Sequence, residues 1–476
     1  MKKIIILTCC LIGSFLTAQA QITLTIDNQA PRLDTRGKPV DAHDGRVIRF
    51  GTKFYWYGTR YGNTNGFTTA NEYVCYSSDD LQRWKLEGSL LPQKPEGVYY
   101  RPHVVFNALT KKYVLWYNWY PKLWNGQFGV AESDSPTGPF QILNDNVPVK
   151  HSSLGVGDLG VFVDDDQQAY LSYNTIQGHR VSVERLDPAY TASTLQGSEF
   201  IDQHCEAGSM FKHRNTYYLL TDYTCCFCTQ GSGAKVFTAS TPLGPYTYRQ
   251  NINRHPGDFA PVLTDGITHD NFFEALDPKQ QHGLHIEWQQ PSEVSEIRIY
   301  QFTGNRAGQC GEVSNPRTHQ PIVQHQFEIS CWENGAWKPL KTKTKVEQMA
   351  QQKKYRLTFD KVHTQRLQVK PLYADSLQVL FLEEVEVTNA KGKLRVFKTD
   401  KRGVGKPIIP AQQTFVMSLQ TPSGVQYLWQ GDLWGSASDN IKGHDYQFWS
   451  KPLQFEPNGL IKPIEWVNEF KISISR

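Results

Sequence analysis

Three acidic residues, Asp44, Asp158 and Glu206, stand at the same position in three similar stretches of the chain. Each precedes an apolar run, a polar turn and an aromatic-rich run. A tyrosine of the second run follows eleven residues after Asp44 and Glu206, and twelve after Asp158. Any one of these acids, taken alone, is equally well explained as a residue that caps a turn. Three acids at one register are better explained by shared chemistry.

Carboxylates that converge are electrostatically costly and are usually found where they are used. A protonated carboxyl can give a proton to a leaving oxygen, and an ionised one can activate water on the opposite face of a sugar. A third carboxylate beside the acid raises its pKa by like-charge repulsion. The pattern therefore predicts hydrolysis of a glycosidic bond.

The acids lead units of an internal repeat, and Arg101 leads a further unit of the same design. The similar segments are 44–58, 101–118, 158–174 and 206–222, with later strands at 71–84, 129–140 and 235–246. Hairpin turns separate the runs. Units of four strands repeating about every fifty residues predict a β-propeller. A fifth unit is expected far downstream, at 412–436 and 446–455.

The elements that position the acids are thus the first strands of the blades. These strands line the central channel of a propeller, so the residues that lead them are expected to meet in one pocket. The predicted fold class is all-β, a five-bladed β-propeller with a β-sandwich inserted between blades four and five. The predicted boundaries are a signal peptide at 1–20, blades one to four at 21–262, the insertion at 263–395, and blade five with the C-terminal closure at 396–476.

The insertion resembles a discoidin-like (factor V/VIII C-type) β-sandwich. The resembling parts are an Asp265-Gly266 turn, an early strand pair at 283–302 and a closing strand pair at 365–387. The resemblance implies sugar binding and allows a structural calcium ion in this domain. A spacer that buttresses the propeller is the alternative. No cofactor is expected for catalysis.

The first twenty residues predict export. Lys2 and Lys3 precede an apolar run, and a small-x-small pattern ends at Ala20, where cleavage is expected. The apolar run is too short to span a bilayer, and no later stretch is apolar enough. The chain is therefore expected to be secreted or periplasmic, without a membrane span.

Composition and charge limit the classes of molecule that the protein is expected to bind. Aromatic residues make up 12% of the chain, as suits short strands, and the net charge of +4 over 476 residues forms no basic stripe. A nucleic-acid partner is therefore not expected. Pairing of Cys310 with Cys331 is one option, and a bridge among Cys205, Cys225, Cys226 and Cys228 is another. No zinc spacing accompanies them, so no metal site is predicted.

The pattern resembles glycoside hydrolase family 43, whose members are five-bladed propellers that invert configuration at the anomeric carbon. The matching stretches are 44–55, 158–171 and 206–219, within a resemblance that covers roughly 30–260 and 400–470. The resemblance implies that Asp44 is the general base, Asp158 the residue that modulates the pKa of the acid, and Glu206 the general acid. Asp41 is a rival base of lower rank.

Some features are closer to the branch of exo-β-1,3-galactanases and β-galactofuranosidases. These are Gly45 after the base, Arg101-Pro102 leading blade two, and the fifth blade with Gln412 and the motif that ends at Trp434. Those galactanases lack the first Asp and carry a Glu where this chain has Tyr100. The conventional base thus looks retained, and strict β-1,3-galactan specificity is put in doubt.

Further substrate contacts are expected around the acids. His43 could bond a sugar hydroxyl or simply be packed, and Arg101 could hold a hydroxyl or form a structural salt bridge. Aromatic faces could stack on a sugar ring. The expected substrate-binding residues are His43, Tyr100, Arg101, Trp119, Gln412, Asp432 and Trp434, and Trp124 is a further aromatic candidate.

The expected function is that of an inverting exo-glycosidase. It would release terminal arabinofuranose, galactofuranose or galactose from a galactan or arabinogalactan, acting as a monomer on an oligo- or polysaccharide. A noncatalytic glycan-binding propeller is the alternative. A phosphorylase is a third option, but it would need a cluster of basic residues, and only Arg101 is evident.

Overall fold

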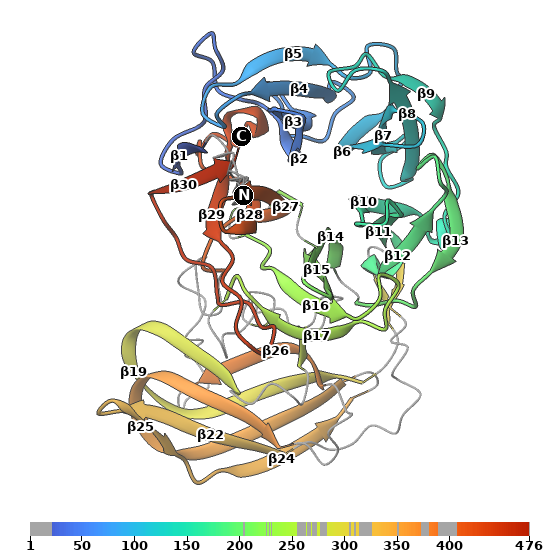
Figure 1. Cartoon of the computed structure of the whole chain (residues 1–476). Coiled ribbons are helices and arrows are strands. Elements are labelled where there is room, and N and C mark those ends of the chain that lie inside the picture. Colours follow the sequence, from blue (N-terminus) through green and yellow to red (C-terminus); the bar gives the residue numbers. More distant parts are fainter. Residues whose placement is uncertain are drawn as a thin grey trace, which may run out of the picture.

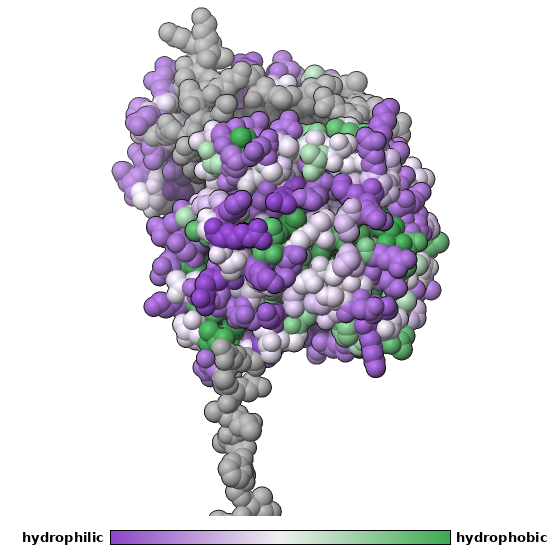
Figure 2. Space-filling view, turned by 90° about the horizontal axis from the view of Figure 1, so that it is seen from above, coloured by the Kyte–Doolittle hydropathy of each residue, from purple (hydrophilic) through white to green (hydrophobic). Residues whose placement is uncertain are grey.

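The computed structural model describes residues 21–202, 205–224, 226–227, 229, 231–254, 263, 268, 274–276, 283–303, 306–308, 311–313, 326–349, 352–372, 380–388 and 407–475. The predicted signal peptide lies outside these residues, as do Cys225, Cys228 and Cys310. Helical structure in the described part is limited to short 3-10 turns, and none of its helices could cross a membrane. Hydrophilic side chains predominate on the face seen in Figure 2, where apolar ones form only small groups.

Five sheets are arranged in a ring, as Figure 1 shows, and four of them have four strands. Each sheet runs outward from the channel in chain order. The strands of blades one and two are β2 (His43–Phe50), β3 (Lys53–Arg60), β4 (Glu72–Ser78), β5 (Lys85–Ser89), β6 (Val98–Asn107), β7 (Lys112–Tyr120), β8 (Gln127–Ser133) and β9 (Gln141–Asn144). Those of blades three and four are β10 (Val156–Val163), β11 (Ala169–Thr175), β12 (Val181–Leu186), β13 (Ser193–Gly197), β14 (Cys205–His213), β15 (Thr216–Tyr223), β16 (Lys235–Ala239) and β17 (Thr247–Asn251).

The fifth blade differs from the expected four strands. Its sheet has three, β27 (Gln412–Thr421), β28 (Gly424–Leu433) and β29 (Tyr446–Pro452). A separate pair, β1 (Gln21–Asp27) with β30 (Glu469–Ser475), joins the two ends of the described chain in antiparallel register. Apolar residues of this pair pack with blades one and five in one cluster, so the pair closes the ring between them.

Aromatic side chains fill the spaces between blades. Trp56 of blade one packs edge-on against Trp84 and is tilted against Trp449 of blade five. All three rings are almost fully buried. Large rings of this kind bury much apolar area and fix the angle between neighbouring sheets. Trp56 of the aromatic-rich second strand thus helps to hold blades one and five together.

The inner strand of every blade carries a β-bulge next to the residue that leads it. The register shifts fall between His43 and Arg46, Tyr100 and His103, Val156 and Leu159, Glu206 and Ser209, and Gln413 and Val416. A bulge bends its strand and re-aims a side chain. The repeated lead position of the sequence is thus a repeated bulge that turns five polar side chains toward the channel.

Glycine at the bulge is needed for close packing of the two inner strands. A Cβ on Gly208 would lie 1.0 Å from the Leu220 carbonyl oxygen, and one on Gly45 would lie 1.9 Å from that of Tyr57. We expect Gly208→Ala to lower the free energy of unfolding by about 3 kcal/mol, because the backbone of the hairpin must move. Chemical denaturation followed by tryptophan fluorescence measures this.

The control for that substitution is Gly37→Ala. Gly37 has a positive φ, unlike Gly208, and no atom lies within 4 Å of a Cβ placed there. Its replacement should cost only about 1 kcal/mol, the penalty of a left-handed backbone for alanine. Equal losses for the two variants would show that the bulge tolerates a side chain.

The insertion contains one seven-stranded sheet, which lies outside the ring in Figure 1. Its order is β18-β26-β19-β25-β22-β23, with β24 also pairing with β25. The strands are β18 (Glu274–Leu276), β19 (Leu284–Phe302), β22 (Gln326–Glu333), β23 (Ala336–Pro339), β24 (Lys343–Gln348), β25 (Gln352–Leu372) and β26 (Leu380–Thr388). A hairpin of β20 (Arg306–Gly308) and β21 (Gly311–Val313) is separate from this sheet.

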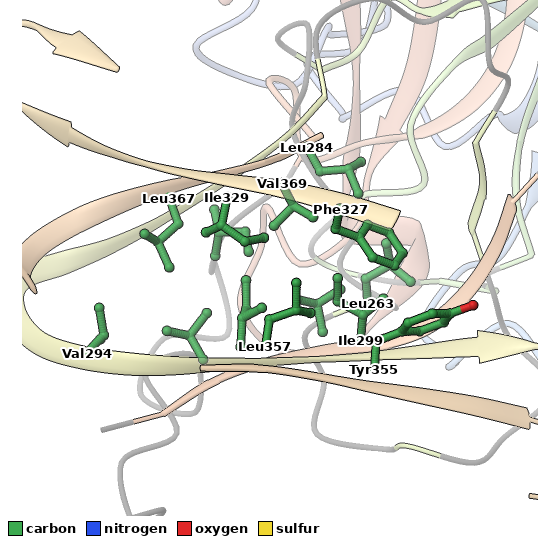
Figure 3. Packing of buried hydrophobic residues seen from close by; sticks show 14 of the residues in the cluster. Leu263, Leu284, Val294, Ile299, Phe327, Ile329, Tyr355, Leu357, Leu367 and Val369 are labelled. Carbon is green, nitrogen blue, oxygen red and sulfur yellow. The ribbon is translucent and has the colours of Figure 1, made fainter. Parts of the chain in front are cut away.

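The two longest strands of the insertion, β19 and β25, run through both halves of a bent sheet. Near one end Leu284 pairs with Val369, and near the other Ile299 pairs with Tyr355. Register shifts lie between these regions, where the strands turn. Figure 3 shows apolar side chains of both halves lying between them, including Ile329 above and Leu357 below. The likeness to a discoidin-like module remains a prediction.

Candidate active site

The three acids that the sequence places at one register line a single open cavity of about 610 Å³. The cavity lies at the bulged starts of the inner strands. It is lined by Asp44, Tyr61, Phe67, Tyr100, Arg101, Tyr120, Trp124, Gly157, Asp158, Asn174, Ile176, His179, Glu206, Cys226, Phe227, Gln412, Gln413, Thr414 and Asp432. All five blades thus contribute to one pocket.

Asp44 is buried at the start of β2 and is held from two sides. The Tyr61 hydroxyl lies 2.9 and 2.7 Å from its two carboxylate oxygens and donates to this carboxylate. The backbone N–H of Asp44 donates to Asp432 Oδ2 at 2.8 Å. Burial and the charge of Asp432 raise the pKa of Asp44 to about 6, against the opposing effect of Arg101. Asp44 is therefore ionised above that pH and can accept a proton.

Glu206 is buried at the start of β14, opposite the fifth blade. Gln412 Nε2 donates to Glu206 Oε2 at 2.6 Å. Burial and the nearby charges of Asp158 and Asp222 raise the pKa of Glu206 well above its usual value. Glu206 thus keeps its proton where Asp44 has lost its own, and two carboxyl groups with separated pKa values can act as acid and base.

Asp158 and Arg101 form an ion pair in the pocket that Asp44 and Glu206 also line. Arg101 Nη2 lies 2.8 Å from Asp158 Oδ2, and its Nη1 donates to the carbonyl oxygens of Gln413 and Thr414 at 3.2 and 3.3 Å. Although burial opposes the charge of Arg101, the surrounding carboxylates raise its pKa. Arg101 therefore lies in the pocket and also makes a salt bridge there, so both roles considered for it occur together.

Each limb of the pH profile should depend on a different neighbour. As the pH falls through about 6, Asp44 gains a proton and kcat/KM should fall. Asp432→Asn removes a negative charge that raises this pKa, so the acid limb should move to lower pH. Asp158→Asn removes a charge that raises the pKa of Glu206, so Glu206 should lose its proton earlier and the alkaline limb should also move to lower pH.

These shifts are measured as the pH dependence of kcat/KM for the two variants and the wild type. Each variant should move one limb much more than the other. A profile in which both variants move the same limb would contradict the assignment of Asp44 and Glu206 to opposite limbs.

Of the other predicted contacts, Tyr100, Gln412 and Asp432 line the pocket, whereas His43 and Trp434 do not. The His43 ring shares a 3.0 Å hydrogen bond with Asp432 Oδ1 and packs on Trp434 with ring centroids 5.1 Å apart. Burial lowers the pKa of His43, but the charge of Asp432 outweighs this effect, and the pKa is raised to about 9. His43 is thus a packed, charged residue that supports Asp432. Neither His43 nor Trp434 lines the pocket, so the predicted direct sugar contact is corrected for both residues.

Trp119 does not face the pocket either, and this prediction is corrected. Its Nε1 donates to the Asp145 carbonyl oxygen at 2.6 Å, and its ring stacks on Tyr99 in the apolar cluster shared by blades one and two. Side chains alternate along a strand, so a residue of β7 one step away, Tyr120, lines the pocket instead. Trp124, the other candidate, also lines the pocket and is half exposed.

The rival base, Asp41, lies outside the residues that line the pocket. Its carboxylate accepts hydrogen bonds from the backbone N–H groups of Tyr61 and Gly62 at 3.0 and 2.8 Å. Asp41 therefore fixes the turn that presents Tyr61 to Asp44.

Sequence reasoning missed Asp222, a fourth carboxyl group directly across from Glu206. The two residues are register partners on β14 and β15, and Asp222 is fully buried. The Ser232 hydroxyl donates to Asp222 Oδ2 at 2.5 Å, and burial raises the pKa of Asp222 to about 8. Counting outward from the hairpin turn would have paired Glu206 with Tyr223, because the bulge between Glu206 and Ser209 shifts the register by one residue. The sequence therefore held no simple signal for Asp222, and none for Tyr61.

No group of His, Cys, Asp and Glu side chains in the described ranges could hold a metal ion. In the Asp164-Asp165 turn, the Lys212 ammonium lies 2.9 Å from a carboxylate oxygen of each residue. The lysine thus neutralises part of the negative charge of this turn. The optional calcium ion of the insertion stays a prediction.

A propeller whose pocket pairs a protonated Glu206 with an ionisable Asp44 defines a glycoside hydrolase by class. The chain belongs to glycosyl hydrolases family 43, which it matches over residues 38–281. That match covers Asp44, Asp158 and Glu206.

The individual relatives have low sequence identity to this chain. The arabinoxylan arabinofuranohydrolase of Bacillus subtilis (strain 168) is 26% identical over 307 residues, which are 54% of this chain and 58% of that protein. The chain therefore aligns with less than two thirds of that relative's length.

Solved structures share the fold. An exo-β-1,3-galactanase from Clostridium thermocellum has a TM-score of 0.54 at 17% identity, over 94% of this chain and 66% of that one. A family 43 β-1,3-galactosidase solved with galactodeoxynojirimycin has a TM-score of 0.52 at 17% identity, over 93% and 99%. Identities this low support the propeller fold alone.

Proposed function

We propose that this protein is an inverting exo-glycosidase that releases a terminal arabinofuranose, galactofuranose or galactose from galactan or arabinogalactan chains. The observation that carries this proposal is the separation of roles between two buried carboxyl groups in one pocket. Burial and neighbouring charge keep Glu206 protonated, while Tyr61 donates a hydrogen bond to the Asp44 carboxylate.

In the proposed reaction Glu206 gives its proton to the glycosidic oxygen as the bond to the anomeric carbon breaks. Asp44 removes a proton from a water molecule, whose oxygen forms the new bond on the opposite face of the sugar. The products are a free sugar of inverted anomeric configuration and the shortened glycan. Asp158 holds Arg101 and adds the negative charge that keeps the proton on Glu206.

The proposed substrate class draws on the relatives. One is named for arabinofuranose release from arabinoxylan, and two solved neighbours are named for β-1,3-linked galactose. The two sugars in these names, arabinofuranose and galactose, are neutral. The pocket of this chain is lined by aromatic rings of Tyr61, Tyr100 and Tyr120, which suit the apolar faces of such a sugar.

The test is activity on a panel of p-nitrophenyl α-L-arabinofuranoside, β-D-galactofuranoside and β-D-galactopyranoside, together with arabinogalactan. We expect turnover of at least one aryl glycoside and release of monosaccharide from the polymer. Proton NMR of the first-formed product should show the inverted anomer. A retained anomer would contradict water attack assisted by Asp44, and a wild type that cleaves nothing on the panel would overturn the proposal.

Further parts of the proposal concern the setting of the enzyme. The chain is proposed to be secreted or periplasmic after cleavage at Ala20, to act as a monomer and to need no cofactor. The insertion is proposed to be a discoidin-like module, with calcium as an optional structural ion. N-terminal sequencing of exported protein and size-exclusion chromatography with light scattering test the first two points.

A further inference from the structure

His179 lines the catalytic pocket but has no role in the acid–base machinery. It belongs to the short 3-10 turn η2 (Gln177–His179), between β11 and β12 of blade three. Its side chain is only 6% exposed, and within the described part of the chain neither Nδ1 nor Nε2 has a hydrogen-bond partner. Leaving buried polar atoms unpaired costs free energy, so such atoms call for an explanation.

The backbone at His179 is also unfavourable. Its φ is +42°, in the left-handed region, and it follows Gly178 at +72°. Thr175 fixes this turn: its Oγ1 donates to the Gln177 carbonyl oxygen at 2.7 Å and accepts from the Arg180 backbone N–H at 3.1 Å. Strained residues held by well-defined surroundings cluster at ligand sites.

A distant segment lies against the same turn. Strand β21 of the insertion contacts η2, although more than 130 residues separate them in the sequence. The insertion therefore reaches the part of blade three that presents His179. The Thr175 hydrogen bonds and this contact thus both involve the turn that carries His179.

The chemistry of the ring limits what it could bind. Burial lowers the pKa of His179 to about 4, so the imidazole is neutral near pH 7, with one nitrogen donating and the other accepting. A sugar hydroxyl offers the matching donor and acceptor. A carboxylate or phosphate would instead require a cation, and the pocket guanidinium of Arg101 is already paired with Asp158.

We propose that His179 is a specificity-determining residue that recognises a hydroxyl group of a neutral sugar in the pocket. This inference rests on the proposed function, which it deepens by excluding uronic acids and phosphorylated sugars from the sugar position that His179 contacts. The unpartnered ring nitrogens, the strained turn and the neutral state of the ring are all explained by one ligand hydroxyl.

The experiment uses the full chain and the aryl glycoside that the wild type cleaves fastest, with its monodeoxy derivatives at each hydroxyl. His179→Leu removes both hydrogen-bonding atoms, and His179→Gln keeps a donor and an acceptor. We expect His179→Leu to lower kcat/KM on the parent glycoside by about 10- to 100-fold. On one deoxy derivative, the two proteins should differ by less than about threefold. His179→Gln should recover part of the loss on the parent.

Melting temperatures show whether each variant is folded, and His179→Gln carries the test if His179→Leu does not fold. A loss that is the same for the parent and every deoxy derivative would overturn the inference, since it would indicate a purely structural role. An undiminished kcat/KM for His179→Leu would overturn it as well. In both cases the active wild type would leave the proposed function standing, whereas a wild type inactive on the whole panel would remove both.

Discussion

Glu206→Gln is expected to lower kcat by about a thousandfold or more on substrates with poor leaving groups. Glutamine keeps the shape of the side chain and can still meet Gln412, but it has no proton to give. The loss should shrink on a 2,4-dinitrophenyl glycoside, because that leaving group departs without protonation. Steady-state kinetics on aryl glycosides that differ in the pKa of the phenol measure this dependence.

The matched control is Glu199→Gln, which changes a side chain that is 99% exposed and lies at the end of blade three. It should retain wild-type rates on every substrate. If Glu206→Gln loses the same factor on good and poor leaving groups, Glu206 does not act as the general acid.

Asp44→Asn is expected to have a comparably large effect, again about a thousandfold or more, but one that is independent of the leaving group. Asparagine cannot take the proton from water, although it can still accept a hydrogen bond from Tyr61. Azide needs no deprotonation, so added azide should restore part of the rate by attacking the anomeric carbon directly. The product would be a glycosyl azide of inverted configuration, with Glu206 still protonating the leaving group.

Kinetics with and without azide, and NMR of the azide product, measure this outcome. Asp79→Asn serves as the control, because Asp79 is a largely exposed carboxylate of blade one and should need no azide. An Asp44→Asn enzyme that keeps more than about a tenth of the wild-type rate on all substrates would exclude Asp44 as the base.

The sequence was sufficient for the parts of the site that follow from the repeat. The lead residues of the inner strands converge because each blade places the same bulge at the same register, and this repetition is visible in the spacing of Asp44, Asp158 and Glu206. Gln412 was proposed in the same way, as the lead of the fifth unit, whereas Asp432 was proposed from the resemblance of the fifth blade to the galactanase branch.

The features that the sequence did not reveal depend on the conformation of loops and on the alternation of side chains along a strand. Whether Trp119 or Tyr120 faces the pocket depends on a shift of one residue in β7, and aromatic residues stand at both positions. His43 and His179 are both buried histidines, yet one is bonded to Asp432 and the other has no hydrogen-bond partner among the residues that the structure describes. Only the folded structure separates a histidine that supports a carboxylate from one that awaits a ligand.

The pairing of β1 with β30 sets the order of events in folding. Thr23 Oγ1 and Ser473 Oγ lie 3.1 Å apart, although 450 residues separate them in the chain. Contacts of such long range are slow to form, because the entropy of closing the loop is lost before the contacts repay it. A growing chain can fold its first four blades, but it cannot complete the ring until its last strand is present. Ring closure should therefore be the late step of refolding, well after the blades acquire their β-structure.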